Sequence, residues 1–132
     1  MGDKLKVSVV LPATPEEVFA AWLSGPTHSR MTGAQATIKK DGSFTAWDGY
    51  CWGKTLKTVA GKSIKQTWRT DEFGKETPDS KLEVQLSKAR GGTKLVLTHS
   101  SLPKGTVKGF REGWVEFYFE PMKAYFKAKN AK

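Results

Sequence analysis

The side chains that could carry out chemistry in this sequence are few and scattered. The two histidines, His28 and His99, are far apart in the chain, and neither belongs to an HExxH or CxxC metal motif. The adjacent acidic pairs Glu16–Glu17 and Asp71–Glu72 point apart in a helix or a strand, so they do not converge as a general acid and base must. The sequence also contains no P-loop and no GxGxxG turn. We therefore expect a non-enzymatic protein without a metal or another cofactor.

Large aromatic side chains are the chemical feature in which the sequence is rich. The stretch SFTAWDGYCWGKTLKTVAGKSIKQTWRT, residues 43–70, holds three of the five tryptophans. Rings of this size suit three roles: an ordinary core, a platform on which nucleic-acid bases stack, or the wall of a ligand cavity. The stacking role requires Trp22 or Trp47 to lie at the surface.

Two polar side chains share the apolar face of predicted strands. Gln66 lies between Ile64 and Trp68 in an alternating pattern, and His99 continues the apolar parity of Leu97. Burying a polar group without a partner costs about 1–3 kcal/mol, so each side chain needs a partner. Either one could orient the polar end of a ligand. Alternatively, His99 lies at the end of its strand, half exposed or bonded to the backbone.

The charge of the chain is strongly positive but spread out. Its 132 residues include 22 Lys and Arg and carry a formal charge of +9, with no block of five or six like charges. Most of these residues are lysines, whereas arginine is the residue that forks onto phosphates and guanine edges, so nucleic-acid binding is disfavoured. The start MGDKLKVSVV lacks the apolar core of a signal peptide, and Cys51 is the only cysteine. We expect a cytoplasmic protein without a membrane span.

Hydrophobic periodicity predicts the elements that position these residues. Alternation predicts a first strand over about residues 4–11, and Thr14 and Glu17 form a capping box for a short helix. GPTHSRMTG indicates a second short helix, and AQATIKK a strand after it. Turn signals then separate further strands, at Asp41–Gly42, Asp48–Gly49 and Gly61–Lys62. The pattern predicts an antiparallel sheet of six to seven strands.

The last segment, from about residue 106 to 129, changes to a helical period. Its apolar residues, Val107, Phe110, Trp114 and Tyr125 among them, recur at spacings of three to four. Pro121 removes a backbone donor inside this pattern. We expect one long amphipathic helix, kinked near residues 117–121.

The order of these elements resembles that of a known superfamily. The likeness rests on ATPEEVFAAWL, GSFTAWDGYCWG, IKQTWR, SKLEVQL, GTKLVLTHSSLP and the GW pair, which stand in this order over nearly the whole chain. The sequence resembles the SRPBCC (START-like) superfamily, whose helix-grip fold is shared by START lipid-transfer domains and the birch-pollen allergen. Within this superfamily it is similar to the domain named for the activator of heat-shock-protein ATPase.

The resemblance implies an α+β fold in which a curved antiparallel sheet wraps around a long C-terminal helix, with two short helices after the first strand. We expect residues 1–132 to form one such domain. The resemblance also implies a hydrophobic cavity between sheet and helix, and therefore a non-catalytic module that encloses a small hydrophobic or amphipathic ligand. The candidates for its lining are Met31, Phe44, Trp52, Gln66, Trp68, His99, Phe110, Trp114, Phe117 and Tyr118. Relatives often carry Gln near the position of His99, so the resemblance assigns His99 no role.

Other functions remain open at this point. The family name implies a chaperone accessory protein that acts on an ATPase chaperone, and the basic surface of this chain suits an acidic partner. Some relatives with this fold are cyclases or hydrolases, so a cavity enzyme is a weaker alternative, and nucleic-acid binding is weaker as well. An apolar ligand should stabilise the fold if the cavity is open, whereas it should have no effect on a solid core.

Overall fold

A computed structural model describes residues 3–70, 72–73 and 76–130 of the chain. The elements are β1 (Asp3–Leu11), α1 (Pro15–Leu23), α2 (Gly25–Thr32), β2 (Thr37–Ile38), β3 (Ser43–Ala46), β4 (Cys51–Val59), β5 (Ser63–Thr70), β6 (Ser80–Ala89), β7 (Gly92–Leu102), α3 (Val107–Gly113), the π-helical segment η1 (Trp114–Phe119) and α4 (Glu120–Asn130). Among these described residues no helix is both long and apolar enough to cross a membrane.

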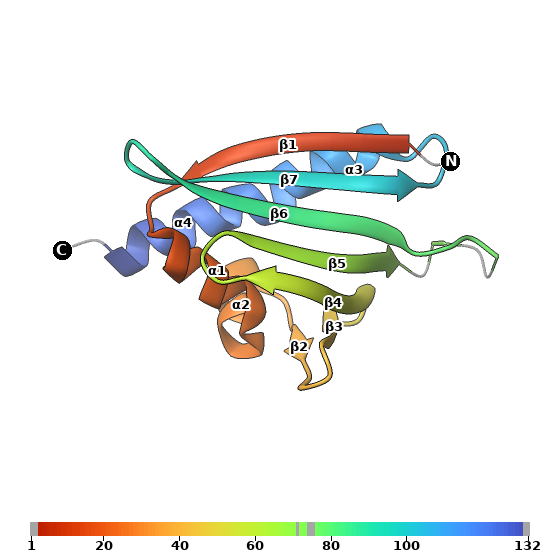
Figure 1. Ribbon diagram of the computed structural model, residues 1–132, viewed down its shortest axis with the longest axis horizontal. Helices are drawn as coiled ribbons and strands as arrows, with labels where there is room; N and C mark the ends of the chain where they lie inside the picture. Colours follow the sequence, from red (N-terminus) through yellow and green to blue (C-terminus); the bar gives the residue numbers. More distant parts are fainter. Residues whose placement is uncertain (1–2, 71, 74–75, 131–132) are drawn as a thin grey trace.

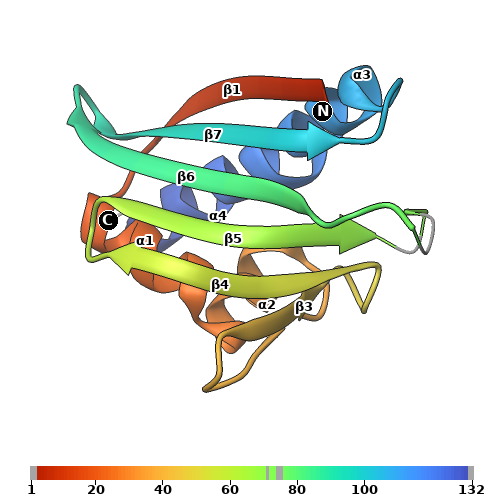
Figure 2. The ribbon, with the colours of Figure 1, turned by 45° about the vertical axis from the view of Figure 1, so that its right-hand side comes forward.

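The strands form one antiparallel sheet with the order β1-β7-β6-β5-β4-β3-β2. Strands β2 to β7 follow one another as a meander, and β1 pairs with β7 and forms the other edge of the sheet. Figures 1 and 2 show the helices on one face of this curved sheet, with the C-terminal helix running across it. The expected α+β helix-grip architecture, with two short helices after the first strand, is confirmed.

The start of α1 follows from its cap. The Thr14 hydroxyl accepts a hydrogen bond from the Glu17 amide at 3.1 Å, and the Glu17 carboxylate accepts one from the Thr14 amide at 3.1 Å. This reciprocal pair satisfies two amides that the first helical turn leaves free. The capping box expected from the sequence is confirmed.

The strand expected in AQATIKK is much shorter than its sequence suggests, because only Thr37–Ile38 pairs with β3. The residues before it are bound to α2 instead. The Ala36 amide donates to the Ser29 hydroxyl at 2.8 Å, and that hydroxyl donates to the Gly25 carbonyl at 2.8 Å. These bonds hold Ala36 against α2, so pairing with β3 begins only at Thr37.

The C-terminal helix is interrupted where proline perturbs it. Pro121 stands in the first turn of α4, directly after the six π-helical residues of η1, and the Glu120 amide bonds to the Val115 carbonyl five residues earlier. Proline lacks an amide hydrogen and its ring crowds the preceding turn, so a wider turn before it relieves both problems. The disturbance expected near residues 117–121 therefore takes the form of a π-helical segment.

The core lies between the inner face of the sheet and the helices. Central strand residues such as Val84 and Leu97 are fully buried, as are Phe119 and Phe126 on the helix side. Trp22 of α1 is also buried, at 2% exposure, so it is not available at the surface for stacking. Part of the aromatic content of the chain therefore fills an ordinary core.

Candidate functional site

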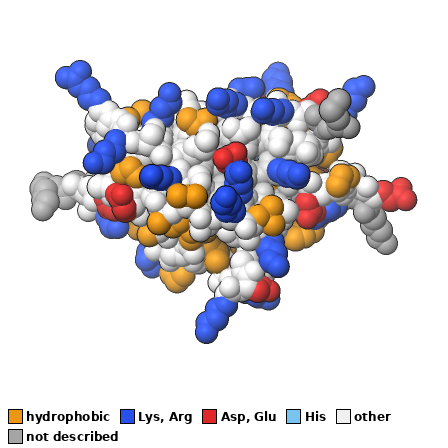
Figure 3. Space-filling model, in the orientation of Figure 1, with side chains coloured by type: hydrophobic (Ala, Val, Ile, Leu, Met, Phe, Trp, Pro, Cys, Tyr) orange, Lys and Arg blue, Asp and Glu red, His pale blue; other side chains and the backbone are white. Residues whose placement is uncertain are grey.

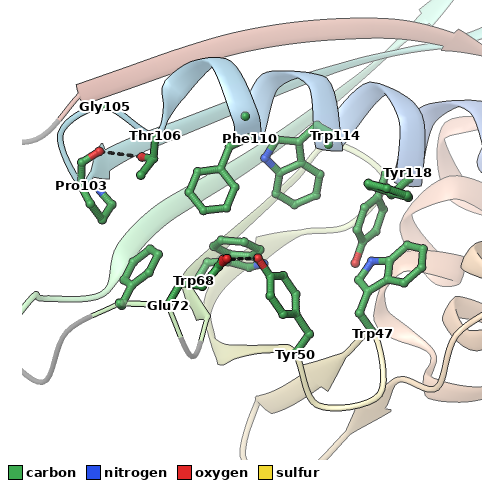
Figure 4. A pocket seen from close by; sticks show the side chains of 14 residues that line it. Trp47, Tyr50, Trp68, Glu72, Pro103, Gly105, Thr106, Phe110, Trp114 and Tyr118 are labelled. Atoms are coloured by element: carbon green, nitrogen blue, oxygen red, sulfur yellow. Dashed lines mark hydrogen bonds between the residues drawn. The ribbon is translucent and has the colours of Figure 1, made fainter.

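A pocket of about 700 Å³ opens beside the N-terminal half of the C-terminal helix. Its wall comes from four places in the chain: the β3–β4 turn, the end of β5 with the loop after it, the loop after β7, and the α3–η1 face (Figure 4). The residues that line it are Trp47, Tyr50, Trp68, Glu72, Phe73, Pro103, Gly105, Thr106, Gly109, Phe110, Gly113, Trp114, Phe117 and Tyr118. Eight of these residues are aromatic.

The helix side of the pocket consists of two parallel rows of residues. Side chains four residues apart lie on the same face of a helix. One row begins with Thr106 and continues with Phe110, Trp114 and Tyr118. The neighbouring row is Gly105, Gly109 and Gly113, ending at Phe117. The helix therefore presents a row of rings next to a groove without side chains.

The glycine groove keeps the pocket open. A Cβ atom placed on Gly109 would meet no other atom within 4 Å, and one on Gly113 would meet only Phe117, at 3.9 Å. Neither glycine has the positive φ that would require glycine in its turn of the helix. Glycine inside a helix costs roughly 1 kcal/mol relative to alanine, so these two residues weaken the helix. Because they have no side chains, they leave the volume of the pocket free.

The aromatic row on the helix packs against the end of β5. The Trp68 ring lies edge-on to Phe110 at a centroid distance of 5.3 Å and tilted to Trp114 at 5.7 Å. Phe73, from the loop after β5, meets Trp68 edge-on at 6.3 Å. Contacts of this kind hold the rings in fixed orientations, so the wall of the pocket is preformed.

A relay of hydrogen bonds fixes His99 beneath this wall. The Trp114 indole N–H donates to Nδ1 of His99 at 3.1 Å, so the ring proton must be on Nε2. Nε2 then donates to the Ser80 hydroxyl at 2.7 Å, which donates to the Trp68 carbonyl at 2.5 Å. Burial lowers the pKa of His99 to about 3. The residue is therefore a neutral structural bridge between β6, β7 and the helix.

A second relay fixes the other end of the aromatic row. His28 donates from Nδ1 to the Trp22 carbonyl at 2.9 Å, which leaves Nε2 to accept from the Tyr118 hydroxyl at 2.9 Å. The Trp47 ring packs edge-on against the Tyr118 ring. Burial lowers the pKa of His28 and raises the pKa of Tyr118, so both groups stay neutral. Together these contacts tie the β3–β4 turn to α2 through the pocket wall.

The turn that supplies Trp47 is held in an unusual conformation. Trp47 and Asp48 both have left-handed backbone angles, with φ of 55° and 57°, which are rare for side chains of this size. The Asp48 carboxylate accepts a hydrogen bond from the Gln35 amide at 2.9 Å and holds the turn in place. This conformation directs the Trp47 ring toward Phe117 and Tyr118 on the helix, at 5.8 and 5.9 Å.

The polar part of the pocket is at its rim, where the Tyr50 hydroxyl donates to the Glu72 carboxylate (Figure 4). Thr70 supports the carboxylate, since its hydroxyl donates to Glu72 at 3.3 Å and accepts from the Glu72 amide at 3.2 Å. Burial and the neighbouring carboxylate raise the pKa of Tyr50 to about 12. The phenol therefore remains a donor at neutral pH. Asp71, which precedes Glu72 in the chain, lies outside the described residues.

The structure brings together half of the residues expected in the cavity: Trp68, Phe110, Trp114, Phe117 and Tyr118 line the pocket. Met31, Phe44, Gln66 and His99 are buried and do not line it, although Phe44 and Gln66 border a small second cavity. Gln66 accepts from the Trp22 indole at 3.2 Å and donates to Thr55 at 3.0 Å, so its polar groups already have partners.

The expectation does not hold for Trp52. This side chain is 37% exposed and lies next to the fully buried Cys51, so it points to the outer face of the sheet. The alternation of β4 is weak, since apolar residues occupy both faces of this strand. Parity alone therefore assigned Trp52 to the wrong face.

Several lining residues were not recognised in the sequence. The Gly105, Gly109 and Gly113 row is visible as glycines at a spacing of four, a signal that could have marked an open helix face. Trp47 was placed at the surface only under the stacking hypothesis, and nothing in the sequence indicated that its turn folds back onto the helix. Glu72 and Phe73 lie in a loop, where periodicity gives no orientation.

Within residues 3–70, 72–73 and 76–130 no group of three or more His, Cys, Asp or Glu side chains could hold a metal ion. The Cys51 thiol is buried and donates to the Ala46 carbonyl, and burial raises its pKa to about 12. A thiol of this kind is a poor nucleophile. The chemistry that the described residues offer is enclosure by aromatic rings, with a carboxylate at the rim.

The chain is similar in sequence to proteins of a known family. The family model described as "Activator of Hsp90 ATPase homolog 1-like protein" matches residues 12–127. The human protein "Activator of 90 kDa heat shock protein ATPase homolog 1" is 26% identical over 125 residues, which are 93% of this chain and 37% of that protein. This chain therefore spans little more than a third of the length of the curated relatives it matches.

Two solved structures illustrate the fold. A crystal structure of an HSP90 activator from Plasmodium falciparum has a TM-score of 0.83 and 22% identity, covering 94% of this chain and 96% of that one. The solution structure of the Aha1 dimer from Colwellia psychrerythraea has a TM-score of 0.73 and 13% identity, covering 98% and 99%. At these identities the likeness is one of fold.

Proposed function

The chain belongs to the Activator of Hsp90 ATPase homolog 1-like family, and on that premise we propose that it is a non-catalytic binding module that encloses a small apolar or amphipathic molecule. The observation that carries this proposal is the open pocket of about 700 Å³ between the sheet and the C-terminal helix. Its size falls within the range of roughly 300–1,000 Å³ that is typical of small-molecule sites.

The cost of keeping the pocket open supports this proposal. A chain selected only for stability would gain from alanine or another strong helix former at Gly109 and Gly113, because helix propensity favours such residues and a Cβ atom would clash with nothing there. The buried relays through His28 and His99 also hold the pocket wall before anything binds. Preorganisation of this kind lowers the entropic cost of taking up a ligand.

The test is to fill the pocket from its own wall. Gly109→Leu should abolish binding of Nile red, a neutral fluorescent dye, while the free energy of unfolding stays equal or rises by up to about 1 kcal/mol. The matched control is Lys108→Leu, which places the same side chain on the same helix but outside the pocket lining. Equal dye binding in all three proteins, or none in the unmodified protein, would contradict the proposal.

A chaperone accessory role is the second candidate, and a surface feature favours it. The outer face of the sheet is rich in exposed lysines, and Figure 3 shows Lys and Arg side chains across it with few acidic ones. Lys6, Lys65, Lys81 and Lys94 are all exposed on neighbouring strands there. A face of this charge suits an acidic surface on a chaperone of the 90 kDa heat shock protein class.

This second candidate predicts a charge-dependent complex. Replacing Lys65 and Lys81 together by Glu should weaken binding to a 90 kDa heat shock protein, with the largest difference at low salt. Lys127→Glu, on the helix side of the molecule, is the control for nonspecific loss of positive charge. If the control weakens the complex as much as the double variant does, the outer face is not the contact surface.

A further inference from the structure

The charge of the pocket is opposite to the charge of the chain. The sequence has 22 Lys and Arg against 13 Asp and Glu, yet none of the described residues that line the pocket is Lys or Arg. Glu72 is the one lining residue with a formal charge among them. Its carboxylate accepts hydrogen bonds from the hydroxyls of Tyr50 and Thr70. An anionic ligand would find no charged partner here among the described residues.

Most hydrogen-bond donors of the lining side chains are already engaged by the protein. The indole N–H of Trp114 donates to His99, and the Trp47 ring packs edge-on against Tyr118. The hydroxyl donors are used in the same way: Tyr50 to Glu72, Thr106 to the Pro103 carbonyl, and Tyr118 to His28. The side chains of the described lining therefore offer a ligand mainly ring faces and the Glu72 carboxylate, since Trp114 and the three hydroxyl groups already donate within the protein.

Aromatic ring faces and a carboxylate both attract the positively charged group of a ligand. The face of an aromatic ring carries negative electrostatic potential and attracts ammonium groups that lie over it. Tyr50 and Trp47 stand at the same side of the pocket as the Glu72 carboxylate (Figure 4). A positive group placed there meets aromatic rings and a negative charge together, while the apolar body of the ligand lies along the glycine groove.

We propose that the molecule enclosed by this pocket is an organic cation, with a flat apolar body and an amine or quaternary ammonium group placed at Glu72 and Tyr50. This inference rests on the proposed ligand-binding function and adds the chemical class of the ligand. The body is directed to the groove of Gly105, Gly109 and Gly113, where the helix backbone allows a flat surface to approach closely.

The test compares three probes that share one naphthalene ring: 1-naphthylmethylamine, 1-naphthylmethanol and 1-naphthoic acid, which are cationic, neutral and anionic at neutral pH. Isothermal titration with the whole chain should give the tightest binding for the amine, about tenfold tighter than for the alcohol, and the weakest for the acid. Such an order is opposite to what the net charge of the chain alone would favour.

The variant Glu72→Gln isolates the carboxylate, since the amide oxygen can still accept from Tyr50. It should reduce the preference for the amine over the alcohol to about twofold or less, with alcohol binding unchanged. Glu76→Gln is the matched control, because it removes the same charge from the same loop outside the lining and should leave the preference intact.

The outcomes separate the two proposals. Equal affinities for the three probes, tightest binding of the acid, or a preference that survives Glu72→Gln would overturn the cation assignment while ligand binding stands. A preference lost equally in Glu76→Gln would also overturn it, because the effect would then be long-range charge. If none of the probes binds and Nile red does not bind either, the proposed function fails and the cation assignment fails with it.

Discussion

His99 illustrates how a buried residue can be essential to a pocket without facing a ligand. Its Nδ1 accepts from Trp114 and its Nε2 donates to Ser80, so both ring nitrogens are occupied by the protein. Protonation of Nδ1 would set two donors against each other, the imidazole N–H and the indole N–H. The relay therefore works only with a neutral imidazole, in keeping with the low pKa of His99.

This leads to a pH dependence that can be measured. Because the folded-state pKa of His99 is lowered to about 3, the unfolded chain binds a proton that the folded chain does not. The contribution of His99 to stability is complete above about pH 6.5 and is lost as the pH falls toward 3, by up to about 1.4 kcal/mol per pH unit. His28, whose pKa is also lowered, adds to the same slope.

The variant His99→Gln distinguishes the contribution of His99 to this pH dependence from that of His28. Glutamine can accept from Trp114 through its oxygen and donate to Ser80 through its nitrogen, so it can keep the relay without titrating. Urea unfolding between pH 5 and pH 7 should show a shallower dependence of the unfolding free energy on pH in this variant. An unchanged slope would mean that His99 does not stay neutral in the folded protein.

Strand parity correctly identified Gln66 and His99 as inward-facing polar residues, but it could not name their partners. Gln66 bonds to Trp22, which is 44 residues away, and His99 bonds to Ser80 and Trp114, 19 and 15 residues away. Partners so distant in sequence are set by tertiary packing, so periodicity cannot give them. The suggestion that these side chains orient a ligand stays a prediction.

At the scale of elements, glycine has two different roles in this fold. In β4, a Cβ atom on Gly53 would lie 2.0 Å from the Thr67 carbonyl oxygen, because the two strands approach closely near a register shift. In α3, a Cβ atom on Gly109 would meet nothing within 4 Å. The first glycine is required by the backbone, and the second leaves space for the pocket.

The same substitution should therefore have opposite effects at the two positions. Gly53→Ala should destabilise the protein by about 1–3 kcal/mol or more, since the neighbouring backbone must move. Gly109→Ala should stabilise it by roughly 0.5–1 kcal/mol through helix propensity. Chemical denaturation of both variants checks the pair, and a loss of stability in Gly109→Ala would show that this glycine has a structural role after all.

Element types were more predictable than element limits. The capping box at Thr14 and the turn at Gly61–Lys62 are local signals, and the structure confirms both. The short β2 was not predictable, because Ser29 in α2 draws Ala36 away from the sheet. The π-helical form of the disturbance before Pro121 also depends on how the helix packs. Local sequence therefore predicts the type of an element, whereas tertiary contacts determine its length and exact form.

At the scale of the whole molecule, the two faces of the sheet differ in character. The inner face carries the helices, the buried relays and the pocket. The outer face carries many Lys and Arg side chains (Figure 3), and Trp52 and Leu56 are exposed. The antiparallel meander followed from the turn signals in the sequence, and the family resemblance implied the helix-grip arrangement and a cavity between sheet and helix. The lining of the pocket was only partly predictable, because two of its walls are loops whose orientation has no periodic signal.

The central claim is that the pocket beside the C-terminal helix binds a small molecule, and the tryptophans report on it directly. In ¹⁵N-labelled protein, titration with 1-naphthylmethanol should shift the indole N–H signals of Trp47, Trp68 and Trp114 with one common dissociation constant. Trp52, exposed on the outer face, serves as the internal control and should not shift. Saturable shifts confined to the three pocket indoles are the predicted result. Shifts centred on Trp52, or none at saturating probe, would contradict the account.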